Sequence, residues 1–395
     1  MTSLDSLYEE VVAFYRGWNE LETSGVYADG QPILDHDNAP PQHHGHFNSR
    51  REVLTVLSDL RRCLGEHADV HPVVQDNLVA SEAYLRATLG ERLSFRDYVS
   101  ALYHYHPAPI PSRTLEATAA KVRSLCQHFG LMYRAEDRAA YLDRFRVESP
   151  EEVAALACAS QDYWLERLYT HVQRPEELKI KVEVVQKDEP WSFFLSGGAG
   201  LMTFSINAHP RHTFTRGQCE YIASHEIAGH AVQNSLWAKA ITQQGLPIAL
   251  QIWTTHHPIV PLTEGLAQAL PYLLCQEPEL GAEMMLAKTL RELRDMALAN
   301  AQLMLEDSSP VTAAWEYCAD RLLFVQPFEI ERDLTNRMLK PSERAYQHCY
   351  SPSFLAFLGV ARRLHPDDVG AFLRSQYQQI PSAREFWRHV EERPS

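Results

Sequence analysis

One stretch of ten residues, Ser224 to Gln233, constrains this chain more than any other. It reads Ser-His-Glu-Ile-Ala-Gly-His-Ala-Val-Gln, so a glutamate directly follows the first of two histidines. Histidines that share one metal ion on a regular helix stand four residues apart, because 3.6 residues complete a turn. His225 and His230 are five apart, which on a regular helix separates them by roughly 140°. They can converge only if the helix carries an extra residue, and we predict a π-bulge at Ala228–Gly229.

The composition is that of an ordinary globular protein and excludes some partners. The 395 residues are 45% hydrophobic and 22% charged, with a formal net charge of −14. Such an excess of acid argues against a nucleic-acid partner. The first residues lack the basic and apolar segments of a signal peptide, and no apolar run is long enough to cross a membrane, so we expect no membrane partner. Seven scattered cysteines without a CxxC pair indicate reduced thiols and a cytoplasmic location.

Two stretches before the metal motif have the alternation that is typical of β-strands. Residues 178–184 alternate apolar and polar side chains strictly, and residues 201–207 form a second β-like stretch after a turn at Ser196–Gly200. We therefore predict a mainly α (α+β) fold with a small antiparallel sheet beside the metal-binding helix.

The rest of the chain has helical periodicity on both sides of these strands. We expect an N-terminal helical region over residues 1–175 and a catalytic region over 176–395, together forming one continuous globular unit. The polar stretch Asp35–His46 holds four histidines, but its prolines and glycine work against a fixed ligand geometry. We predict a solvated loop there.

Start signals place two helices around the motif. Thr215, with Gln218 three residues later, forms a capping box and predicts the start of the helix that carries both histidines. Further along, Thr263 is a good N-cap and predicts a second helix. Glu264 then lies in its first turn, where the helix dipole favours a carboxylate.

The chemistry suggested by this pattern is that of a catalytic zinc site, which commonly has three protein ligands and one open position. His225 and His230 supply two ligands, and we choose Glu264 as the third, because a loop and an antiparallel return can bring it alongside. Glu226 follows the first ligand and is the candidate general base. An oxyanion donor completes such a site. Tyr350 and Tyr346 are the leading candidates for that role, with His348 behind them.

The segment from His225 to His230 resembles the lengthened HExxxH zinc motif of the dipeptidyl peptidase III family. It is also similar to the motif of the microtubule-associated tyrosine carboxypeptidase family, in which a Glu-Gly-Leu-Ala-type segment follows, as it does here at Glu264–Ala267. A third resemblance, to bacterial gluzincins of uncharacterised function, extends over about residues 178–275. These resemblances imply a helical metallopeptidase-like domain in which His225, His230 and Glu264 bind zinc and Glu226 is the base. The motif lacks the proline of the third family and is one residue shorter.

We therefore expect a metallopeptidase with one zinc ion, which cleaves a peptide or small-molecule amide by attack of zinc-activated water. Two alternatives stay open. One is a zinc-dependent hydrolase or tailoring enzyme that acts on a small metabolite or a natural-product intermediate, since a fold does not determine function. The other is a non-catalytic helical scaffold with a structural or vestigial metal site. The bond cleaved and the oligomeric state stay open as well.

Overall fold

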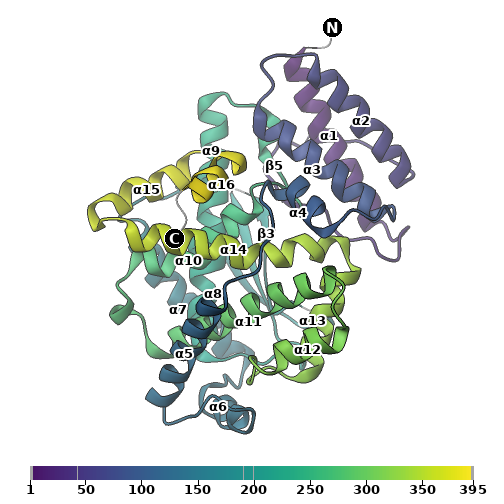
Figure 1. The fold of residues 1–395 in the computed structure, drawn as a ribbon. Coiled ribbons are helices and arrows are strands. Elements are labelled where there is room, and N and C mark those ends of the chain that lie inside the picture. The colour runs from purple at the N-terminus through teal and green to yellow at the C-terminus, as the bar shows by residue number, and fades with distance from the viewer. Residues whose placement is uncertain (1–2, 42, 190, 199, 393–395) are drawn as a thin grey trace.

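The protein is mainly helical with a few short strands, which confirms the predicted fold class. The computed structural model describes the chain apart from residues 1–2, 42, 190, 199 and 393–395. In Figure 1 the first three helices lie together at the upper right, and α14 crosses the middle of the molecule. The helices are α1 (Leu4–Thr23), α2 (Arg50–Gly65), α3 (Pro72–Thr88), α4 (Phe95–Tyr103), α5 (Ser112–His128), α6 (Arg138–Phe145), α7 (Pro150–Leu168), α8 (Arg216–Ala223), α9 (Val232–Gln244), α10 (Val260–Leu274), α11 (Ala282–Glu306), α12 (Val311–Ala319), α13 (Pro327–Leu339), α14 (Pro341–Arg363), α15 (Pro366–Gln378) and α16 (Ala383–Glu392).

In the described part of the chain, the strands form two separate small sheets. They are β1 (Leu34–Asp37), β2 (Lys179–Val185), β3 (Phe193–Gly198), β4 (Leu201–Asn207) and β5 (Ile252–Thr254). β1 pairs with β5 in antiparallel fashion, and the other sheet has the order β2-β4-β3. In that sheet β2 runs parallel to β4, whereas β3 runs antiparallel to it.

The three-stranded sheet is therefore mixed, which corrects the antiparallel sheet expected from the sequence. Both strands recognised by their alternation are present, as β2 and β4. The additional strand β3 takes up part of the stretch expected to be a turn, Ser196–Gly200. The chain reverses once into β3 and again into β4, so that β2 and β4 point the same way. Two glycines end β3, and glycine is depleted in strands, which is why its sequence does not read as one.

The central strand packs directly against the segment that carries the histidine motif. Met202, Phe204 and Ile206 alternate along β4 and therefore point to the same face. Each is 0% exposed and belongs to one hydrophobic core with Ile227 and Ala228 of the motif. Burial of this face holds the sheet beside the candidate metal-binding helix, where the sequence places it.

The N-terminal helices pack around a second hydrophobic core, to which α9 and β5 also contribute. Trp18, Leu57 and Leu78 are buried between α1, α2 and α3, and Ile252 of β5 belongs to the same core. The pairing of β1 with β5 crosses the boundary expected near residue 175. The division into residues 1–175 and 176–395 stays a prediction.

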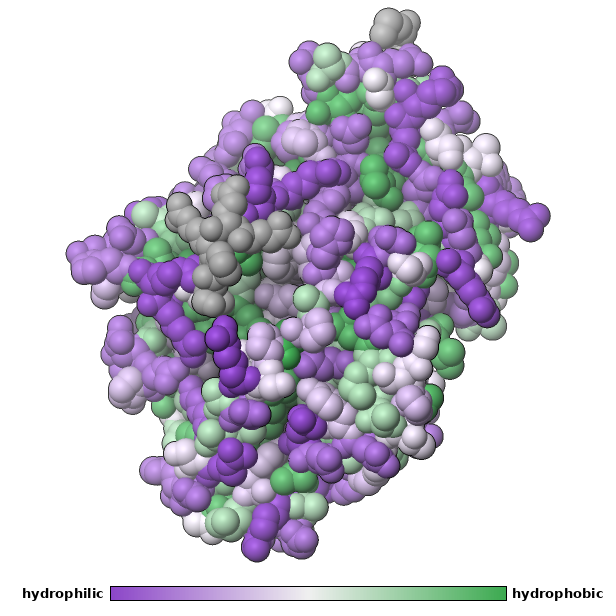
Figure 2. Space-filling model, in the orientation of Figure 1, coloured by the Kyte–Doolittle hydropathy of each residue, from purple (hydrophilic) through white to green (hydrophobic). Residues whose placement is uncertain are grey.

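The surface shown in Figure 2 is mostly hydrophilic, with apolar residues scattered between polar ones. None of the helices in the described part of the chain combines the length and the apolar content needed to span a membrane.

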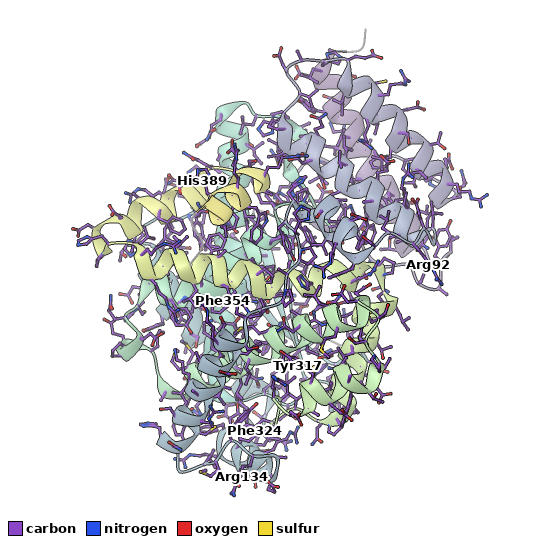
Figure 3. The ribbon with its side chains drawn as sticks, viewed as in Figure 1. Arg92, Arg134, Tyr317, Phe324, Phe354 and His389 are labelled. Carbon is purple, nitrogen blue, oxygen red and sulfur yellow. The ribbon has the colours of Figure 1, made fainter. Side chains whose placement is uncertain are left out.

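Helices α10 and α14 approach each other closely near the motif. A Cβ added to Gly265 would lie 2.7 Å from the backbone of Ser353, so a side chain at this position of α10 would push the helices apart. Figure 3 labels Phe354, the next residue of α14, in the middle of the molecule. Through this close packing, side chains of α14 reach residues on α10.

Candidate metal centre

The two histidines lie on a π-helical segment, Ser224–Ala231, between α8 and α9. The helix before it begins as predicted, with Thr215 and Gln218 in a reciprocal capping box. The segment includes Ala228 and Gly229, which confirms the predicted bulge. Hydrogen bonds in a π-helix join residues five apart, so His225 and His230 face the same side. Their Nε2 atoms are 3.2 Å apart.

Two contacts hold the π-helical segment against its neighbours. A Cβ at Gly229 would lie 2.7 Å from the Cβ of Ala267 on α10, so only glycine permits this approach. Tyr377 on α15 is fully buried and donates a hydrogen bond from its hydroxyl to the carbonyl oxygen of Ala228, at 2.8 Å. A π-bulge disturbs the regular backbone bonding of a helix, and this bond supplies a partner for one carbonyl.

Glu264 lies further into its helix than the sequence suggests. α10 begins at Val260, with Ile259 as N-cap, so the prediction of Thr263 as N-cap is wrong. Pro261 falls in the first turn, where its fixed φ and missing N–H fit the helix start. The hydroxyl of Thr263 instead donates to the carbonyl of Val260, at 2.9 Å. The helix dipole acts mainly within the first turn, so it favours the Glu264 carboxylate less than expected.

Glu264 nevertheless meets both histidines. Its Oε2 atom is 3.2 Å from Nε2 of His225 and 3.5 Å from Nε2 of His230. With the 3.2 Å between the two imidazole nitrogens, the three atoms form a nearly equilateral triangle. Ligand atoms about 2.0–2.1 Å from one tetrahedral zinc ion are about 3.3–3.4 Å apart. The triangle therefore has the dimensions of one face of a zinc coordination tetrahedron.

The electrostatics of this triangle favour a cation. Glu264 Oε2 is buried and accepts no well-formed hydrogen bond from any residue that the structure describes. Burial alone would raise the pKa of Glu264, but the two histidines hold it well below its usual value. Burial alone would lower the pKa of His230, yet the neighbouring Glu264 carboxylate raises it to about 9. A buried carboxylate is costly unless a positive charge accompanies it; without a metal a proton on His230 supplies that charge, and a bound metal ion would take its place.

The three side chains are the candidate metal-binding group in the described part of the chain. A catalytic zinc site typically has three protein ligands, which leaves one position for water or substrate. A structural zinc site typically has four.

Glu226 follows His225 on the π-helical segment and stands outside the triangle. Burial raises its pKa, and the carboxylates of Glu264 and Asp35 raise it further, whereas the two histidines lower it. A general base works best when its pKa lies near the working pH, so a raised pKa suits a carboxylate for this role at neutral pH. The environment of Glu226 therefore supports proton transfer beside the candidate metal.

Tyr346 and Tyr350 both reach this region from α14. The hydroxyl of Tyr346 donates a hydrogen bond to Oε1 of Glu264, at 2.7 Å. The ring of Tyr350 lies edge-on beside that of Tyr346, with 5.5 Å between centroids. Tyr346 thus contacts the Glu264 oxygen that does not face the histidines, and so it can orient the carboxylate. Stabilisation of an oxyanion by either tyrosine stays a prediction.

His348, the remaining candidate donor, belongs to a different environment. Its Nδ1 atom is hydrogen-bonded to the hydroxyl of Tyr105 at 2.9 Å, and its ring packs edge-on against Phe95. Burial lowers its pKa to about 3. Residues two apart on a helix point in roughly opposite directions, so His348 faces away from Tyr346 and Tyr350. We assign His348 to packing.

We expect Tyr346→Phe to weaken zinc binding by about 10- to 100-fold, because removing the partner of a ligating carboxylate typically has an effect of this size. The dissociation constant is measured by competition with a chromogenic chelator. Tyr105→Phe is the matched control, since it also removes a buried tyrosine hydroxyl from a hydrogen bond but does not contact the triangle. Equal zinc affinity in wild type and Tyr346→Phe would rule out the orienting role.

One acidic side chain near the site is not recognisable in the sequence. Part of the stretch expected to be a solvated loop, Asp35–His46, forms β1 instead, which corrects that prediction. The carboxylate of Asp35 contributes to raising the pKa values of Glu226 and His230. No local pattern signals it, because this short strand exists through its pairing with β5, far along the chain.

The chain matches no protein-family model and no curated protein sequence. Among solved structures, one described as a "putative lipoprotein" from Colwellia psychrerythraea is similar over 99% of this chain and 76% of its own, with a TM-score of 0.60 and 13% identity. An M32 carboxypeptidase from Deinococcus radiodurans R1 aligns over 98% of this chain and 97% of its own, with a TM-score of 0.32 and 11% identity. The second score is too low to establish a common fold. The first likeness shows that the fold of this chain occurs in another solved protein.

Proposed function

We propose that this protein is a zinc-dependent metallohydrolase that cleaves peptide or amide bonds. The observation that carries the proposal is the triangle of ligand atoms from His225, His230 and Glu264. Glu226 directly follows the first of these ligands in the chain. Two imidazoles and a carboxylate suit zinc, whereas magnesium and calcium prefer oxygen ligands alone. This arrangement supports a centre that binds a zinc ion, activates a water molecule and hydrolyses an amide bond.

Each residue of the site has a separate role in such a reaction. When bound, a zinc ion lowers the pKa of water and polarises a carbonyl group. Glu226 accepts a proton from the attacking water and delivers it to the leaving nitrogen as the carbon–nitrogen bond breaks. Tyr350 donates a hydrogen bond to the developing oxyanion, or Tyr346 does so when its single O–H turns away from Glu264. The hydroxyl of the water thus ends on the carbonyl carbon, and its proton ends on the amine.

The position of β3 supports an extended peptide as the substrate. Among the described strands, β4 is the hydrogen-bonded neighbour of β3, so the other edge of β3 is not paired within its sheet. β3 also packs near the π-helical segment that carries the ligands. An extended peptide can add to such an edge through backbone hydrogen bonds.

The proposal is tested by removing and restoring the metal. We expect about one zinc ion per chain by elemental analysis of protein purified without chelators. Dialysis against a strong chelator should abolish hydrolysis of a mixed peptide library, read by mass spectrometry, and added zinc should restore it. A protein that binds no metal, or that is fully active after metal removal, would refute the proposed function.

We also propose a reducing, cytoplasmic location. All seven cysteines lie in the described part of the chain and are free. Cysteines that stay unpaired are typical of compartments that keep thiols reduced. Thiol titration of protein from cells lysed under alkylating conditions measures their redox state directly.

A further inference from the structure

We propose that Arg291 binds a carboxylate of the substrate, either the terminal one on the leaving-amine side of the scissile bond or an acidic side chain on the acyl side. The inference rests on the proposed hydrolase function and adds the class of substrate. Arg291 lies on α11, which packs against both α8 and α14 (Figure 1). Contacts through each of these two helices lead from α11 to the candidate metal centre.

The guanidinium of Arg291 lies beside the tyrosines of α14. Its central carbon is 5.7 Å from the centre of the Tyr350 ring, within the range of a cation–π contact. The Tyr350 ring is 5.5 Å from that of Tyr346, whose hydroxyl donates to Oε1 of Glu264 at 2.7 Å. Two aromatic rings thus connect the guanidinium to the carboxylate at one corner of the ligand triangle.

The same face of α11 also contacts the helix that leads into the histidine motif. Lys288 precedes Arg291 by about one turn, so the two side chains lie on one face of α11. The Nζ atom of Lys288 is 5.3 Å from the centre of the Tyr221 ring on α8, and that ring is 6.1 Å from the imidazole of His225. These contacts place this part of α11 beside the triangle independently of those through α14.

Arg291 keeps hydrogen-bond donors available for a ligand. Within the described residues, its hydrogen bond is the one from Nε to Oδ2 of Asp295, at 2.8 Å. Nη1 and Nη2 have no hydrogen-bond partner in that part of the chain, and the side chain is 42% exposed. Arg344 of α14, in contrast, donates from both Nε and Nη2 to Glu306. The bond to Asp295 thus holds the guanidinium in place, and its terminal nitrogens can bind the two oxygens of a carboxylate.

The separation from the metal centre sets the position of this carboxylate in the substrate. An extended peptide advances about 3.3–3.6 Å per residue. The steps of 5.5 Å between the two tyrosine rings and 5.7 Å to the guanidinium therefore correspond to about three residues. A carboxylate about three residues from the scissile bond can reach Arg291.

The inference is tested by calorimetry of two pairs of hydroxamates, which chelate zinc, with the zinc-loaded protein. In the first pair, N-hydroxysuccinamoyl-leucylglycine carries a terminal carboxylate on the leaving-amine side, and its glycinamide analogue is neutral. In the second pair, acetyl-glutamyl-alanyl-leucine hydroxamate carries an acidic side chain on the acyl side, and its glutaminyl analogue is neutral. We expect wild type to bind the carboxylate probe of at least one pair about tenfold more tightly than its neutral partner, by a margin that shrinks as salt is added. The pair that shows the preference identifies the source of the carboxylate.

Substitutions isolate the contribution of Arg291. Arg291→Gln should bind both members of each pair equally, whereas Arg291→Lys, which keeps the charge without the planar fork, should keep part of the preference. Arg51→Gln, at an exposed position of α2, is the matched control for loss of one positive charge and should keep the full preference. Binding of the neutral probes shows that each variant is folded.

Two results would overturn this inference alone. They are equal binding within both pairs by wild type, and a preference that survives in Arg291→Gln. Failure of all four probes to bind would overturn the hydrolase proposal and this inference with it.

Discussion

Replacing Glu226 by glutamine should lower kcat by about 10²- to 10⁴-fold while zinc stays bound, because general-base catalysis commonly contributes an effect of this size. The amide has nearly the shape of the carboxylate but cannot accept a proton from water. The ligand triangle of His225, His230 and Glu264 is not altered by the change. Mass spectrometry of peptide hydrolysis tests the loss of rate. Elemental analysis of the same preparation tests whether zinc stays bound.

Glu220→Gln is the matched control for this experiment. Glu220 lies on α8, in the same continuous helical stretch, and burial raises its pKa as it does that of Glu226. It is not part of the triangle, so the control variant should keep both its zinc and its rate. Full activity in Glu226→Gln would exclude Glu226 as the base. Loss of zinc from that variant would show that it acts on the metal site instead.

Replacing His230 by alanine should weaken zinc binding by about 10²- to 10³-fold, since the free energy of binding zinc is shared among a few ligands. The triangle of ligand atoms loses one corner and cannot hold the ion as before. Chelator competition measures the dissociation constant. Thermal unfolding gives an independent measurement, because zinc at 100 times its Kd stabilises the wild-type fold by about 2.7 kcal/mol.

His212→Ala provides the comparison for His230→Ala. His212 is also partly buried, and its ring bonds Ser192 and the carbonyl of Glu189 rather than the triangle. We expect it to bind zinc like wild type and to show the same thermal shift when zinc is added. If His230→Ala keeps the affinity of wild type, then His230 is not a ligand and the proposed centre is wrong.

The sequence was most informative where the chemistry depends on local spacing. The five-residue interval between His225 and His230, with Gly229 in between, predicts a π-bulge, and the bulge is present. The capping box at Thr215 is likewise a local signal and is confirmed. Both predictions hold because backbone hydrogen bonding over a few residues decides them.

Prediction from the sequence failed where a local signal competed with another or was missing. Thr263 has the side chain of an N-cap, yet Pro261 and its neighbours place the helix start earlier. The last three residues of β3, Ser196–Gly198, lie in the predicted turn, although pairing with β4 makes them part of a strand. At the first place a competing local signal decides where the helix begins, and at the second the pairing of two neighbouring strands outweighs the local preference.

Spacing along the chain is enough to predict the motif: two histidines five residues apart, which requires a bulge, and a glutamate between them. How distant groups meet this motif depends instead on the packing of helices and strands. Tyr377 bonds the carbonyl of Ala228, and Tyr346 bonds Glu264. Local spacing reports on hydrogen bonds within one helix, whereas contacts between α10, α14, α15 and β1 follow from how their buried faces pack, which no short pattern records.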